Sequence, residues 1–115
     1  FWPGPLTLVV PKNPNLPEAV SATATVAVRV PDHAVALALL RAAGPMAVTS
    51  ANISGQPSPV TADEVFTQLG GRIELIINGG KTPGGKPSTL VDCTGDEPVI
   101  LRNGPISMAE LLSVL

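Results

Sequence analysis

The chain has 115 residues, the size of one small domain, and 44% of them are hydrophobic, which is enough for a single buried core. Only 14% are charged and the net charge is −2, which disfavours tight nucleic-acid binding by this chain alone. No apolar run approaches the roughly 20 residues of a membrane span.

The single cysteine, Cys93, cannot form an internal disulfide, so a reducing, cytoplasmic compartment fits best. We interpret Cys93 as structural, because it follows an acid rather than the basic residues that activate a thiol.

The chain up to residue 49 predicts three strands and one helix. Apolar runs at 6–10 and 26–30 are bounded by Pro, Asn and Gly, and both are typical of strands buried on two faces. Pro31 and Asp32 predict a stop and an N-cap, followed by a helix from His33 to Ala43. Residues 46–49 predict the third strand. Because the first residue is Phe1 rather than Met, we expect that a segment has been removed upstream.

The rest of the chain continues the alternation. Residues 50–59 have the composition of a loop, and Thr61 with Glu64 has capping-box spacing at the start of a helix that ends near Leu69. The later predictions are a strand at 72–77, a Gly/Pro-rich connection at 79–87, strands at 88–92 and 98–101, and a short C-terminal helix opened by Ser107 and Glu110. Strands that alternate with helices predict an α/β or mixed α+β fold, a mixed sheet with helices packed over it.

Residues 49–55 combine hydroxyl and amide side chains directly after a predicted strand. Ligands favour the carboxyl ends of strands in open α/β sheets, and such groups form anion-binding concavities. On the local pattern alone, an ordinary polar turn is the favoured interpretation. The glycines at 79–85 lack the spacing of a phosphate-binding loop and no helix follows them.

Arg29 and Arg102 each end an apolar run, where an arginine is either a solvated strand end or a fork aimed at a carboxylate or phosphate. His33 has no partner in a triad arrangement, and we expect it at the surface near the helix start. No His, Cys or carboxylate cluster has metal-ligand spacing. The residues therefore predict neither a catalytic nucleophile nor a metal ligand.

Five segments stand in series along the chain, namely FWPGPLT at 1–7, TVAVRVP at 25–31, TSANISG at 49–55, PSTLVD at 87–92 and LRNGPI at 101–106. Together they resemble the YrdC-like threonylcarbamoyl-AMP synthases. The resemblance covers residues 1–115 and implies a partial domain, the C-terminal half of the YrdC-like fold. That fold is a twisted mixed sheet flanked by helices around a concave, positively lined cavity.

The resemblance also implies roles by matching position. Four residues would face ATP: Thr25, Asn52, Val60 through its backbone, and Arg102. Arg29, Ser50 and Ser88 would face L-threonine. The implied reaction forms a carbamate from bicarbonate on the threonine amine, and a carbamate oxygen then displaces pyrophosphate from ATP, with Mg²⁺ expected on the triphosphate. Such chemistry relies on positioning and electrostatics rather than on a covalent nucleophile.

Two departures from the family matter. Its upstream half, with a P-T-[DE]-T-x-Y-G-L segment and a K-x-R pair that contact both substrates, is absent from this sequence, and Asn103 replaces the usual proline. We therefore expect the chain alone to be inactive. We also expect it to oligomerise through an uncovered sheet edge, unless residues 1–5 fold back over the gap.

The resemblance implies that the product passes to a tRNA-modifying transferase complex, with a weak RNA contact and no membrane. Two alternatives stay open. One is an RNA-binding or interaction module of the same fold, which the negative charge disfavours. The other is the carbamoyl-transfer domain of a hydrogenase-maturation protein, which shares the Ser-Ala-Asn segment.

Overall fold

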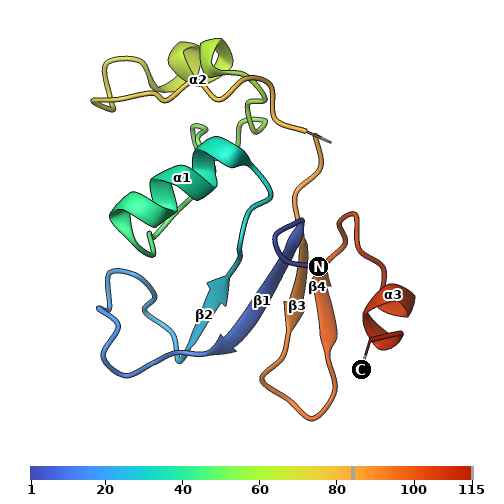
Figure 1. The fold of residues 1–115 in the computed structure, drawn as a ribbon. Helices are drawn as coiled ribbons and strands as arrows, with labels where there is room; N and C mark the ends of the chain where they lie inside the picture. Colours follow the sequence, from blue (N-terminus) through green and yellow to red (C-terminus); the bar gives the residue numbers. More distant parts are fainter. Residues whose placement is uncertain (84, 115) are drawn as a thin grey trace.

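The computed structural model describes residues 1–83 and 85–114, and its sheet has four strands (Figure 1). The strands are β1 (Leu6–Pro11), β2 (Thr25–Val28), β3 (Thr89–Asp92) and β4 (Val99–Arg102). They are ordered β2-β1-β3-β4, with β1 parallel to β3 and with β2 and β4 antiparallel to their neighbours. The predicted mixed sheet is therefore confirmed.

This topology brings distant segments to one end of the sheet. Because β2 and β4 run against β1 and β3, the starts of β1 and β3 lie beside the ends of β2 and β4 (Figure 1). Pro5, Arg29, Ser88 and Arg102 flank or end these strands, and we call this region the Arg29 end of the sheet. The opposite end is where Thr25 pairs with Pro11.

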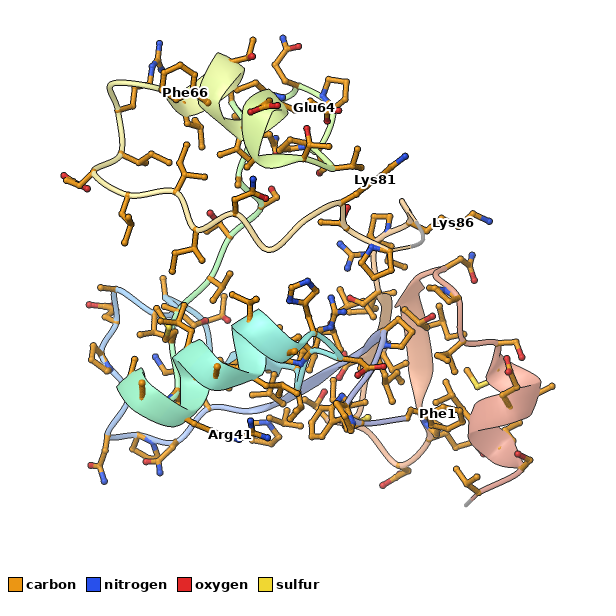
Figure 2. All side chains as sticks on the ribbon, turned by 45° about the horizontal axis from the view of Figure 1, so that its top comes forward. Phe1, Arg41, Glu64, Phe66, Lys81 and Lys86 are labelled. Atoms are coloured by element: carbon orange, nitrogen blue, oxygen red, sulfur yellow. The ribbon has the colours of Figure 1, made fainter. Side chains whose placement is uncertain are left out.

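The helices are α1 (Ala34–Ala43), α2 (Ala62–Leu69) and α3 (Met108–Leu112). Figure 1 shows α1 beside β2 and α3 beside β4, while α2 lies farther from the sheet than α1 in both views (Figure 2). In the described part of the chain, no helix is long and apolar enough to cross a membrane.

The helix starts follow their sequence signals with one exception. Thr61 Oγ1 accepts from the Glu64 N–H at 3.3 Å, and Ser107 with Glu110 forms a complete capping box. The exception is α1, whose N-cap is His33 rather than Asp32, with no side-chain cap bond. The predicted cap was therefore one residue early, and the Asp32 side chain has no capping role.

The fully buried core is small and lies between the sheet and α3. It consists of Leu6, Val91 and Leu111. Partly buried side chains pack around it, namely Leu8, Ile100, Ile106 and Met108. The prediction that the first two strands are buried on both faces is wrong, because their side chains are mostly half-buried and neither α1 nor α2 covers them closely.

The segments 46–49 and 72–77 were predicted as strands and do not form them. A strand needs a neighbour with which its backbone can pair, and neither segment has a ladder partner among the described residues. Their apolar side chains stay largely in solvent. Val48 is 79% exposed and Leu75 is 74% exposed.

Candidate functional site

Ser88 is the centre of a polar cluster at the Arg29 end of the sheet. Its side chain is buried, and its Oγ lies 2.6 Å from Thr7 Oγ1 on the neighbouring strand. Arg102 donates from Nη2 to Ser88 Oγ at 3.2 Å and from Nε and Nη2 to the Ser88 carbonyl at 3.2 and 3.1 Å. One edge of the guanidinium is thereby fixed, and its Nη1 makes no hydrogen bond to another described residue. The cluster presents a positioned cation and two hydroxyls.

The turn after β4 is held against the start of β3. Thr89 is fully buried, and its Oγ1 donates to Ile106 O at 2.8 Å and accepts from Ile106 N–H at 2.9 Å. Gly104 lies so close that a Cβ there would come within 2.2 Å of Thr89 N. A side chain at 104 would therefore displace the turn from the start of β3.

Arg29 is fixed by the opening segment of the chain. Its Nε donates to Gly4 O at 2.9 Å, and Gly4 N–H donates to Val30 O at the same distance. A Cβ on Gly4 would lie 2.5 Å from the Phe1 carbonyl oxygen, so a larger residue would displace this segment. The two terminal amino groups of Arg29 make no hydrogen bond to another described residue and are free for a ligand.

A cavity of about 270 Å³ opens at this end of the sheet. It is lined by Gly4, Pro5, Arg29, Asp32, Pro83, Lys86 and Pro105. Lys86, like Lys81, projects from the connection between α2 and β3 (Figure 2). Drug-sized ligands occupy pockets of about 300–1,000 Å³. The cavity is therefore large enough for a small charged molecule.

The loop that carries Asn52 is tied to α2 rather than to the sheet. Gln68 on α2 accepts from Ile53 N–H at 3.0 Å and donates to Pro57 O at 3.1 Å. The Asn52 side-chain nitrogen Nδ2 donates to Ile53 O and Gln56 O. The other polar atom of this side chain is Oδ1. This buried oxygen has no hydrogen-bond partner. A buried acceptor without a partner is uncommon and marks a place for an external donor.

The structure places the predicted site residues in separate groups. Ser88 and Arg102 are in contact at the Arg29 end of the sheet, and Arg29 is at the same end beside the outer strand β2, whereas Thr25 lies at the opposite end. The other three predicted residues belong to the segment of the chain that connects α1 to α2, namely Ser50, Asn52 and Val60. Among the described residues, no hydrogen bond joins these three to Ser88 or Arg102, so their convergence stays a prediction.

One contact does connect the α2 region to the chain leading into β3. The Val60 carbonyl accepts from Thr82 N–H at 2.8 Å. Thr82 belongs to the connection that also carries Lys86, so the backbone at Val60 is linked to the cavity-lining segment.

Sequence reasoning did not single out Thr7, which contacts Ser88, or Asp32 and Lys86, which line the cavity. Thr7 could have been found as the polar residue within the apolar run of β1, next to the matched Ser88 strand. Asp32 was assigned to helix capping, and Lys86 belonged to a segment without a helix or strand signal. Cys93, predicted to be structural, is exposed. Within the described residues, no three His, Cys, Asp or Glu side chains are grouped to hold a metal ion.

The chain matches a known protein family. The Sua5/YciO/YrdC family model, described as telomere recombination, matches residues 1–104, and the chain belongs to this family. Threonylcarbamoyl-AMP synthase of Bacillus subtilis is 47% identical over 118 residues, covering 100% of this chain and 34% of that protein. A putative threonylcarbamoyl-AMP synthase of Mycobacterium tuberculosis H37Rv is also 47% identical, with 54% of its length covered. The chain thus spans between a third and about half of these relatives.

Solved structures show the same fold. Pyrococcus abyssi Sua5 complexed with L-threonine matches with a TM-score of 0.93 and 47% identity, covering 100% of this chain and 34% of that chain. Escherichia coli YciO matches with a TM-score of 0.83 and 33% identity, covering 94% of this chain and 54% of that chain. The predicted YrdC-like fold is therefore confirmed.

Proposed function

We propose that this chain is part of an L-threonylcarbamoyladenylate synthase, a nucleotidyltransferase that converts L-threonine, bicarbonate and ATP into threonylcarbamoyl-AMP and pyrophosphate. The observation that carries the proposal is that the Arg102–Ser88 pair and the small cavity lined by Arg29 lie at the same end of the sheet. The names of the relatives and the L-threonine complex of Pyrococcus abyssi Sua5 support the same reaction.

Arg29 suits the carboxylate of threonine, and the Ser88 hydroxyl suits the threonine hydroxyl. Ser50 is a further contact to threonine. Arg102 suits a phosphate of ATP, because its guanidinium is fixed on one edge and free on the other. The unpartnered Oδ1 of Asn52 suits an amino or hydroxyl donor of the nucleotide. By family position, Thr25 and the Val60 backbone are also assigned to ATP.

The chemistry follows from these positions. The threonine ammonium first releases one proton to solvent, the neutral amine attacks the bicarbonate carbon, a C–N bond forms, and water leaves to give the carbamate. A carbamate oxygen then attacks the α-phosphorus, and the bond to the bridging oxygen breaks to release pyrophosphate. Fixed cations such as Arg102 stabilise the charge that develops at the phosphoryl oxygens. Mg²⁺ accompanies the triphosphate as part of the substrate.

The product would pass to a tRNA-modifying transferase complex in the cytoplasm, where ATP and tRNA are available. A weak RNA contact is compatible with this role. The sequence's net charge of −2 gives that contact little electrostatic support.

A chimera tests the proposal. This chain replaces the matched region of the Bacillus subtilis relative, and pyrophosphate release from ATP is measured with and without L-threonine and bicarbonate. We expect release that depends on both, and no release above a blank from the 115-residue chain alone. A folded chimera that binds both substrates and releases no pyrophosphate would contradict the proposal.

A further inference from the structure

The cavity at the Arg29 end carries charges of both signs. Its charged lining residues are Arg29, Lys86 and Asp32. In the described part of the chain, no salt bridge within 4.0 Å joins Asp32 to either cation. The Nε of Arg29 is occupied by Gly4 O, which leaves the terminal amino groups for a carboxylate. The cavity therefore offers cationic and anionic groups that are not neutralised by one another.

Asp32 is held in a defined place relative to Arg29. Only Val30 and Pro31 separate them, Val30 O accepts from Gly4 N–H at 2.9 Å, and the ring of Pro31 restricts the backbone. Because His33 is the N-cap of α1 and makes no side-chain cap bond, Asp32 is not used to cap the helix. Its carboxylate remains available at the cavity.

We propose that Asp32 binds the α-ammonium group of the amino-acid substrate, while Arg29 binds its α-carboxylate. A free α-amino acid presents one group of each sign on adjacent atoms, which matches this lining. The cavity volume of about 270 Å³ suits a ligand of that size. This inference rests on the proposed function and adds the group that recognises the amine.

The inference predicts a requirement for both charges of the ligand. L-threonine should bind the full 115-residue chain more tightly than N-acetyl-L-threonine, which lacks the ammonium, and 1-amino-2-propanol, which lacks the carboxylate. Binding is measured by NMR titration. Loss of one charge-assisted contact corresponds to about tenfold or more in affinity.

Variants assign each charge to a residue. Asp32→Asn should weaken L-threonine binding about tenfold and remove the preference over the N-acetyl compound. Arg29→Ala should remove the preference over the amino alcohol, and Asp63→Asn on α2 is the matched control. Thermal unfolding of each variant separates a helix-dipole role of Asp32 from ligand binding.

Equal binding of L-threonine and its N-acetyl form by the unaltered chain would overturn the inference without any variant. Absence of L-threonine binding, or an Asp32→Asn variant that keeps the wild-type preference, would overturn it as well. The proposed function is judged separately. A chimera that makes no threonylcarbamoyl-AMP refutes the reaction, even if the chain discriminates these ligands as predicted.

Discussion

Arg102 donates to both the carbonyl oxygen and the hydroxyl of Ser88, at 3.1 and 3.2 Å, and so connects the end of β4 to the residue that precedes β3. The arginine therefore holds Ser88 while leaving part of its guanidinium for a ligand. A lysine cannot reproduce this geometry, because it has no planar fork of donors.

Replacing this arginine should impair the reaction more than it impairs folding. In the chimera, Arg102→Ala and Arg102→Lys are each expected to lower kcat/KM by about tenfold or more, the loss of at least one charge-assisted contact. Arg41→Ala is the control, because Arg41 is exposed in the last turn of α1. Equal rates for the Arg102 and Arg41 variants would contradict the role of Arg102.

Gly104→Ala should destabilise the fold strongly. The new Cβ would lie 2.2 Å from Thr89 N and 2.8 Å from Pro87 O, and neither backbone atom can move without disturbing β3. We expect a loss of about 1–3 kcal/mol or more in the free energy of unfolding, measured by urea denaturation. Gly95→Ala is the control, since its nearest neighbouring atom lies 4.0 Å away. Equal stability of the two variants would show that the turn after β4 is not tightly packed.

The cap of α3 should make stability depend on pH. Hydrogen bonds from the Ser107 hydroxyl and then its N–H lower the pKa of Glu110 from its ordinary value of 4.5. A lowered folded-state pKa stabilises the fold above that ordinary value, and the stabilisation is lost as pH falls through the folded-state pKa. Glu110→Gln should therefore lower the melting temperature at pH 7, and the difference from wild type should shrink at pH 3. A difference that is the same at both pH values would argue against the ionised cap.

Exposed apolar side chains should cause self-association. Phe66 is 67% exposed and Leu101, on the edge strand β4, is 55% exposed. Large apolar patches and open sheet edges are uncommon in monomers. We expect size-exclusion chromatography with light scattering to give a mass above the 11.7 kDa of one chain. A single monomeric peak with cooperative unfolding would refute this.

Local signals in the sequence predicted the local structure well. The capping pairs at Thr61 and Ser107 and the strands at β1 and β3 were found from residue type and spacing alone. These features depend on neighbouring residues. Segments 46–49 and 72–77 have the same apolar character as the true strands, but strand formation also needs a partner, which composition does not reveal.

The site was predictable only in part, because it depends on contacts between residues that are far apart in the sequence. Arg29, Ser88 and Arg102 were expected in one site from the family resemblance, and the antiparallel and parallel pairings place them at one end of the sheet. The role of Asp32 was hidden, because an aspartate before a helix is usually a cap. Asp32 does not cap the helix, because the backbone of α1 begins one residue later and makes His33 the N-cap, which only the structure shows.

The central claim is that the amino-acid substrate binds at the Arg29 end of the sheet. Titration of the ¹⁵N-labelled chain with L-threonine tests it most directly, because each backbone N–H reports its own surroundings. We predict the largest shift changes at Gly4, Arg29 and Ser88, and little change at Thr25 at the opposite end of the sheet. Shifts concentrated instead around the second cavity, of about 190 Å³ beside Phe66 and Leu75, would contradict the account.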